Sequence, residues 1–240
     1  SKKPWSFPGS SRGEEPKQRF ESELRVTKED SRPMRGSITM DRSSSAIRST
    51  SDTRPLSQRD GVHFENDEMS GIAGILNLDG RPADPDLLRR MIDTLVHRGP
   101  DGEGLWTQGP VGLGHRMLHT TPESLQERQP LADETGDLCL TLDGRVDNRD
   151  ELRVALEAKG AKLRSDTDAE LVLRAYELWG EECPKQILGD FAFAIWDGRN
   201  QQLFCARDIL GIKPFYYYTN GYTFLFASEL RPLFEAPAVR

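Results

Sequence analysis

The strongest constraint on the fold of this chain is a change of pattern at residues 69–76. Residues 1–68 mix both charge signs with Ser, Pro and Gly, and they show no sustained apolar repeat of two or 3.6 residues. Such a segment cannot bury enough apolar surface to offset the entropy of ordering it. After it, apolar runs, turn signals and amphipathic segments alternate. We therefore expect a disordered Ser/Arg-rich extension over 1–68, a folded domain over 69–236, and the start of a linker over 237–240.

The composition narrows the class of protein. A formal net charge of −7 argues against a nucleic-acid partner, and no apolar run is long enough to span a membrane. The cysteines are far apart and odd in number, so they suit neither a disulfide framework nor a zinc site. We expect a cytoplasmic protein without nucleic-acid, membrane or metal binding, whose cysteines are small core residues. These are Cys139, Cys183 and Cys205.

The pattern after residue 68 predicts both strands and helices. Residues 71–77 form a short apolar run with glycine at two positions, which predicts a buried strand. Asp84 is a suitable N-cap for a helix with apolar residues at helical spacing, and two later helices should end at Gly160 and Gly180. Residues 191–196 are apolar on both faces, which is typical of a strand covered on both sides. Many strands with helices in two groups favour an α+β fold with stacked antiparallel sheets.

Five short motifs follow one another in this region. They are MSGIAG at 69–74, HRGPDG at 97–102, GDFAFAIWD at 189–197, ARDILGIKPFYY at 206–217 and ASEL at 227–230. Together they resemble the N-terminal glutaminase domain of asparagine-synthetase-type enzymes, the class II glutamine amidotransferases. The resemblance covers residues 69–236. It implies an N-terminal-nucleophile hydrolase fold, an αββα sandwich of two antiparallel sheets between helical layers.

The resemblance also implies a catalytic scheme. In that family the residue after the initiator Met is Cys, whose thiol attacks the side-chain amide of glutamine while its own α-amino group acts as the base. An α-amino pKa of about 8 leaves part of the amine neutral at cellular pH. The ammonia is used by a second, ATP-dependent domain. Here the reactive position holds Ser70, a poorer nucleophile.

The substrate pocket implied by the resemblance has changed as well. The family's glutamine-binding Arg aligns with Met117, and the neighbouring Arg116 would point to the opposite face of the strand. The family's Asn-Gly-Glu, which holds the substrate amide and forms the oxyanion hole, aligns with residues 143–145, where an Asp would repel developing negative charge. The family's ammonium-binding Asp is kept. The implied pocket residues are Met117, Asp143, Gly144, Arg145 and Asp168.

These substitutions favour a glutaminase-like domain that has lost its activity. Such domains occur in relatives that make amide bonds without ammonia, such as β-lactam synthetases and lasso-peptide cyclases, which this chain resembles. The leading hypothesis is the N-terminal domain of an ATP-dependent amide-forming enzyme, with a structural role beside a C-terminal synthetase domain. ATP and Mg²⁺ are expected in that domain, which is absent here, and no cofactor is expected in this chain. The alternatives are an active glutaminase with Ser70 as nucleophile, for which glutamine would be the ligand, and a free-standing binding or regulatory module.

Two other groups of residues could carry chemistry. His115 and His119 have the four-residue spacing of a helical metal site, but they fall in a predicted strand without acidic neighbours, so we expect structural roles. Arg207, Asp208 and Lys213 could form a catalytic cluster. Since the family uses this stretch to shape a turn and hairpin, we assign all three to the scaffold.

Overall fold

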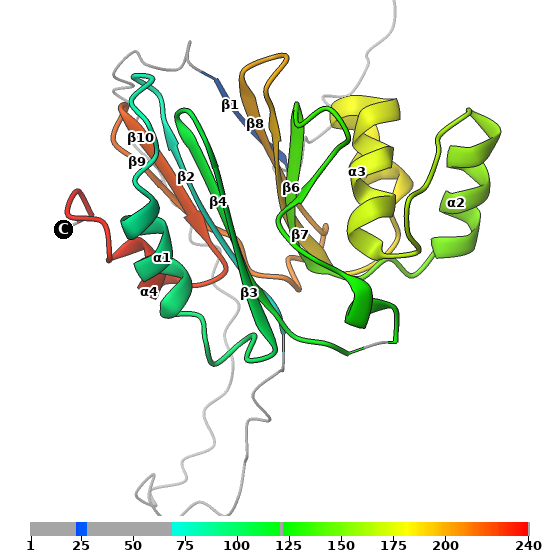
Figure 1. Cartoon of the computed structure of the whole chain (residues 1–240), viewed down its shortest axis with the longest axis horizontal. Helices are drawn as coiled ribbons and strands as arrows, with labels where there is room; N and C mark the ends of the chain where they lie inside the picture. Colours follow the sequence, from blue (N-terminus) through cyan, green and yellow to red (C-terminus); the bar gives the residue numbers. More distant parts are fainter. Residues whose placement is uncertain (1–22, 28–68, 121, 240) are drawn as a thin grey trace, which may run out of the picture.

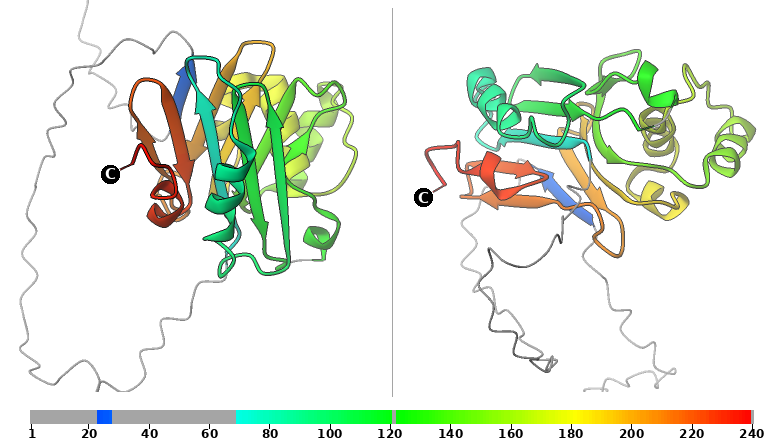
Figure 2. Two further views of the ribbon diagram at one scale, coloured as in Figure 1. Left: turned by 60° about the vertical axis from the view of Figure 1, so that its left-hand side comes forward. Right: turned by 90° about the horizontal axis from the view of Figure 1, so that it is seen from below.

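The computed structural model describes residues 23–27, 69–120 and 122–239. These residues form two antiparallel sheets that face each other, with helices packed on both outer sides (Figures 1 and 2). The α+β sandwich expected from the sequence is therefore confirmed. The disorder predicted for 1–22 and 28–68 falls outside the described residues. Within the described ranges, no helix is both long and apolar enough to cross a bilayer.

The first sheet contains the strand that follows Ser70. Its five strands run in the order β3-β4-β2-β10-β9, and the central strand β2 is buried along its whole length. Asn220 and Gly221 lie in the turn between β9 and β10, where the backbone N–H groups of Tyr222 and Thr223 donate to Asn220 Oδ1. The strands are β2 (Gly71–Asn77), β3 (Gly102–Gln108), β4 (Val111–Met117), β9 (Tyr216–Thr219) and β10 (Thr223–Ala227).

The second sheet has the order β1-β8-β7-β6-β5. As the pattern predicted, β7 is buried on both faces: its Phe and Ile side chains pack beneath helices, while Ala192, Ala194 and Trp196 face the first sheet. All three cysteines of the chain are buried in the core. The strands are β1 (Glu23–Thr27), β5 (Leu131–Ala132), β6 (Leu138–Gly144), β7 (Phe191–Asp197) and β8 (Gln202–Arg207).

The helices cover the two outer faces. Helices α1 (Pro85–Asp93) and α4 (Leu230–Leu233) lie on the first sheet, and α2 (Arg149–Ala158) and α3 (Asp168–Trp179) lie on the side of the second sheet (Figure 1). Asp84 caps α1 as predicted, because its carboxylate accepts from Asp86 N–H at 2.9 Å. The cap of α3 is Thr167. Two 3₁₀ turns, η3 (Glu123–Gln126) and η4 (Gly180–Gln186), complete the described elements.

Strand β1 differs from the expectation for residues 1–68. Glu23–Thr27 pairs with β8 in antiparallel register, with Val26 opposite Leu203. The sequence ELRVT alternates polar and apolar residues, but over five positions in a charged surrounding this alternation is too short to stand out as a period. The pairing depends on a partner strand nearly 180 residues away in the chain, which local pattern cannot reveal.

Close packing between the first sheet and α1 gives a stability prediction. A Cβ at Gly114 of β4 would lie 2.4 Å from Ile92 Cγ1 on α1, whereas a Cβ at Gly102 of β3 would meet nothing closer than Met117 Cβ at 3.6 Å. We expect Gly114→Ala to destabilise the chain by about 1–3 kcal/mol through overpacking, and Gly102→Ala to change stability by no more than roughly 0.5 kcal/mol. Urea unfolding measures both, and equal midpoints would contradict the packing.

Candidate functional site

The predicted nucleophile position lies where β2 begins. Ser70 is half-buried; its Oγ accepts a hydrogen bond from Leu118 N–H at 3.1 Å, and its carbonyl oxygen accepts from Arg98 Nε at 2.9 Å. The ladder that pairs Gly71 with Arg116 leads directly to Met117, which is buried at the end of β4. The structure therefore brings Ser70 beside Met117, the residue that the resemblance aligns with the family's glutamine-binding Arg.

The neighbouring Arg116 is engaged by helix α1 and by strand β3. Its guanidinium lies under α1, where Nε donates to Ile92 O at 3.1 Å and a terminal nitrogen donates to Asp93 at 2.8 Å. It also pairs with Glu103 at 2.9 Å. These contacts place Arg116 on the α1 side of the first sheet, and since neighbouring side chains of a strand alternate between faces, Met117 is expected on the other side.

Asp143 at the end of β6 is held by two cations. Its carboxylate is 1% exposed; Oδ2 accepts from an Arg98 terminal nitrogen at 3.1 Å and Oδ1 lies 3.2 Å from Lys213 Nζ. Burial raises the pKa of the Asp143 carboxyl, and the charges of Lys213 and Arg98 oppose that rise. Both carboxylate oxygens of Asp143 face cationic donors. In this arrangement the side chain acts as an acceptor and offers a ligand no hydrogen-bond donor.

Arg98 connects the separate parts of the site. In addition to Ser70 O and Asp143, its guanidinium lies 3.4 Å from Glu229 Oε1, which His97 Nε2 contacts at 2.9 Å. Beyond it opens a pocket of about 430 Å³ whose lining includes Arg98, Pro214, Tyr216, Glu229, Leu230 and Arg231. One arginine thus joins the start of β2, the end of β6 and the segment before α4.

Two of these residues were not expected in the site. Arg98 occurs in the HRGPDG motif, which served only as a mark of resemblance. Lys213 was expected to belong to the scaffold, and its side chain in addition reaches Asp143 at 3.2 Å. The scaffold role does hold for Asp208, whose carboxylate accepts from the backbone N–H groups of Ile212 and Lys213 at 2.9 and 3.0 Å. The sequence feature that could have indicated Lys213 is its place directly before Pro214 in the motif ARDILGIKPFYY at 206–217.

Asp168 already has a cationic partner within the chain. It lies at the first turn of α3, where Oδ2 accepts from Val146 N–H at 3.2 Å and Oδ1 is hydrogen-bonded to Arg149. Arg149 also bonds the carbonyl oxygen of Asp166. The carboxyl of Glu127 is close by, and burial raises its pKa, with the nearby Asp168 charge adding to the effect and a hydrogen bond from Gln129 opposing it. The Arg149 guanidinium is thus bonded to the Asp168 carboxylate, which the resemblance assigns to binding the ammonium group of a substrate.

The other two predicted pocket residues differ in accessibility. The Arg145 side chain is 65% exposed and pairs with Asp147 at 2.8 Å and with Asp190 at 3.6 Å. Gly144 is enclosed, since a Cβ there would lie 2.6 Å from the backbone oxygen of Asp190. Close approach of β7 therefore explains a glycine at residue 144, whereas the contacts of Arg145 are those of a surface residue.

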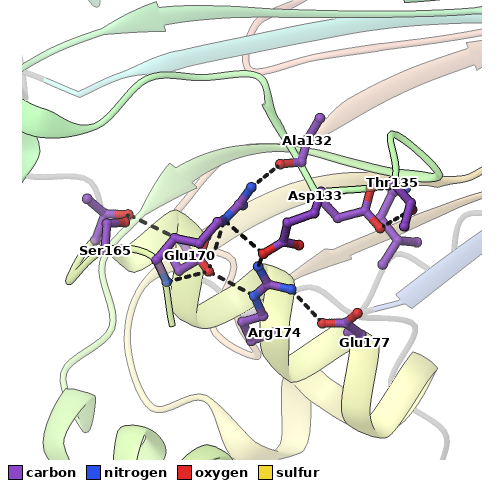
Figure 3. A network of polar contacts seen from close by, with 11 residues as sticks. Ala132, Asp133, Thr135, Ser165, Glu170, Arg174 and Glu177 are labelled. Atoms are coloured by element: carbon purple, nitrogen blue, oxygen red, sulfur yellow. Dashed lines mark hydrogen bonds and ion pairs between the residues drawn. The ribbon is translucent and has the colours of Figure 1, made fainter. Parts of the chain in front are cut away.

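A buried charge network anchors α3 (Figure 3). Glu170, which is 1% exposed, accepts from Arg174 Nε and from Arg164, both at 2.8 Å. Burial alone would raise the pKa of Glu170, but the hydrogen bonds from Arg164 and Arg174 outweigh it and the pKa lies below its usual range. Arg164 continues to Ala132 O at 2.9 Å. The network ties the first turn of α3, and with it Asp168, to β5.

The two histidines do not form a metal site. His115 is buried between the sheets, with Nε2 3.0 Å from Leu142 O, whereas the backbone N–H of His119 donates to Asp101. Burial lowers the pKa of His115 to about 4, so the ring is neutral at pH 7 and its Nε2–H donates across the core. Across the described part of the chain, no group of three or more His, Cys, Asp or Glu is arranged to hold a metal ion.

Comparison with known proteins places this arrangement in a family. Residues 69–240 match the glutamine amidotransferase domain model. The chain belongs to this family. It is 36% identical over 175 residues to asparagine synthetase 3 (glutamine-hydrolysing) of Bacillus subtilis, covering 72% of this chain and 28% of the relative. It is 34% identical over 181 residues to a putative asparagine synthetase 2 of Methanocaldococcus jannaschii, covering 68% and 34%.

The family is therefore the class II amidotransferase domain of asparagine-synthetase type. The chain spans about a third or less of the length of these curated relatives. Among solved structures it is similar to the Bacillus subtilis glutamine phosphoribosylpyrophosphate amidotransferase, with a TM-score of 0.56 and 20% identity over 68% of this chain and 42% of that one. At that identity the likeness shows the fold alone, the N-terminal-nucleophile sandwich.

The cation pair around Asp143 predicts a large effect of removing the carboxylate. Asp143→Ala leaves Arg98 and Lys213 buried without their shared partner, and we expect a loss of about 3–5 kcal/mol in the free energy of unfolding. The matched control is Asp147→Ala, which removes an exposed partner of Arg145 and should cost no more than about 1 kcal/mol. Urea denaturation compares them. Similar losses in the two variants would show that the buried pairing contributes little.

The buried imidazole predicts a pH dependence of stability. The folded pKa of His115, about 4, lies below its ordinary value of 6.5, so the folded state binds fewer protons and stability falls as the pH drops from 6.5 towards 4. This difference corresponds to roughly 3 kcal/mol. We expect His115→Gln to flatten the change in unfolding free energy across that window, while His119→Gln, which leaves His115 in place, keeps it. Urea titrations at several pH values measure the slope.

Proposed function

We propose that this chain is the glutaminase-like domain of an ATP-dependent, amide-forming enzyme of asparagine-synthetase type, and that it does not hydrolyse glutamine. The observation that carries this proposal is the pairing of Asp143 with Arg98 and Lys213. At the position where the family supplies an oxyanion donor, this chain has a buried acceptor with both oxygens in use. Transition-state charge would meet a carboxylate in place of an N–H group.

Two further features support the loss of glutamine hydrolysis. Met117 provides no charge for the α-carboxylate of glutamine, and Arg116 is committed to Asp93 and Glu103 on the far face. At the ammonium side, Arg149 is bonded to Asp168. A glutamine zwitterion would therefore lack its expected cation and would have to displace an internal one.

The role that remains for such a domain is structural. We infer that it packs on a synthetase domain of the parent enzyme, where ATP and Mg²⁺ would act, and that the enzyme works in the cytoplasm. The matched region is 28% and 34% of the length of the two relatives named as asparagine synthetases, which leaves room for a further domain in a parent of that kind. Reading the coding frame past residue 240 tests this part, because a frame without a Ser-Gly-Gly-x-Asp-Ser pyrophosphate loop would contradict it.

The activity proposal predicts no glutamate release. Protein that begins at Ser70, which presents the α-amino base, and the full chain are incubated with glutamine and assayed for glutamate. We expect rates at the level of the enzyme-free background for both. Turnover well above background that Ser70→Ala abolishes would establish the alternative, a working glutaminase with a serine nucleophile.

A reconstruction series provides the matched control. Ser70→Cys alone restores the nucleophile but none of the pocket, so it should stay inactive. Adding Met117→Arg, Asp143→Asn and Arg145→Glu restores the residue types of the family pattern. Glutamate release from Ser70→Cys alone would show that the pocket is competent and would contradict the argument from Asp143 and Met117.

A further inference from the structure

Strand β8 lies next to the edge strand β1 of its sheet, and its side chains are mostly apolar. Residues 202–206 are all buried. Leu203 and Cys205 pack between the two sheets, while Phe204 and Ala206 pack in the core beneath the helices. One side of β8 pairs with β7 over six residues and the other with β1 over five. Without β1, the backbone N–H and C=O groups on that side would form an open edge.

The strand that covers this edge lies outside the family domain. The family match begins at residue 69, whereas β1 is Glu23–Thr27. An uncovered edge with apolar side chains on both faces is a template for pairing with another extended chain. The matched domain therefore has a strand-binding edge that it does not fill from its own residues, as far as the described elements go.

The contact that β1 makes is more than backbone pairing. Val26 is 6% exposed and belongs to the core cluster between the sheets, which also contains Leu203 and Cys205 of β8. Val26 is directly opposite Leu203 in the ladder. Main-chain hydrogen bonds together with one buried branched side chain are the features by which a sheet edge recognises an added strand.

We propose that the free edge of β8 is a binding site for an extended peptide strand, and that in this protein Glu23–Thr27 fills it from within the same chain. The ligand class is an antiparallel strand with a branched apolar residue at the place of Val26. A segment of the same chain has the advantage of a high effective concentration over strands from other molecules. The site is independent of the glutamine pocket, so it does not rest on the proposed function.

Proline substitution in the full chain tests the pairing. Neighbouring residues of an edge strand direct their N–H groups alternately toward and away from the partner strand. Of the two prolines in Arg25→Pro with Val26→Pro, one therefore removes an N–H that pairs with β8, whichever of the two residues faces that strand. Hydrogen exchange is followed on peptides covering residues 202–207. We expect those amides to exchange about tenfold faster or more, with β6 unchanged. The control, Ser44→Pro with Ser45→Pro, lies in the extension outside β1 and should leave β8 protected.

Unchanged exchange in β8 would overturn the proposal. If the double-proline chain does not fold, Val26→Asp gives the second test, because it keeps every backbone donor and places a charge in the core position. Faster exchange confined to β8 in that variant supports the site, and exchange equal to that of the unmodified chain overturns it.

A peptide experiment tests whether the edge accepts a strand from outside. A fluorescent peptide of residues 20–30 is titrated into the double-proline variant and into the unmodified chain. We expect saturable binding to the variant, little to the unmodified chain, and none for a peptide with proline at 25 and 26. No binding to the variant would overturn the proposal. Concentration-dependent dimers of the unmodified chain that the prolines abolish would overturn the assignment to the same chain and identify a second copy as the occupant.

Discussion

A single guanidinium joins the parts of the chain that define the candidate site. Arg98 follows α1, and it reaches the carbonyl oxygen before β2, the carboxylate at the end of β6 and the carboxylate before α4. These contacts span both sheets. A buried arginine must keep its charge, so each partner is required to supply an acceptor. Asp143 is therefore part of the support between the two sheets.

The need of a buried charge for a partner also applies to the two carboxylates that the resemblance assigns to the pocket. The Asp143 carboxylate gives the cations Arg98 and Lys213 a negative charge to share. With Arg149 bonded to Asp168, the carboxylate that would bind an ammonium is neutralised within the protein. In both cases a carboxylate at a position that the resemblance assigns to the pocket takes part in an internal ion pair. Stability and rigidity of the site then no longer depend on a bound molecule.

Much of the fold could be predicted because its signals are local. Asp84 as a cap, the glycines that end α2 and α3, and the two-faced apolar strand β7 each express their structure within a few residues. For the candidate site, the resemblance named Ser70, Met117 and Asp143 from motif positions, and the structure places Ser70 beside the β4 end that holds Met117. Contacts between distant segments could not be read in this way. The contact of Lys213 with Asp143 and the pairing of β1 with β8 each join residues far apart in the chain, which no single stretch of sequence encodes.

The burial of all three cysteines has a practical consequence for labelling chemistry. Burial raises the pKa of both Cys139 and Cys205 far above the neutral range, which keeps these thiols protonated and slow to alkylate. Cys183 is fully covered as well. A thiol placed at residue 70, which is only half-buried, would be the accessible one in the native protein. A fluorophore or spin label could then be attached there without removing any native cysteine, and it would report directly on the surroundings of Arg98.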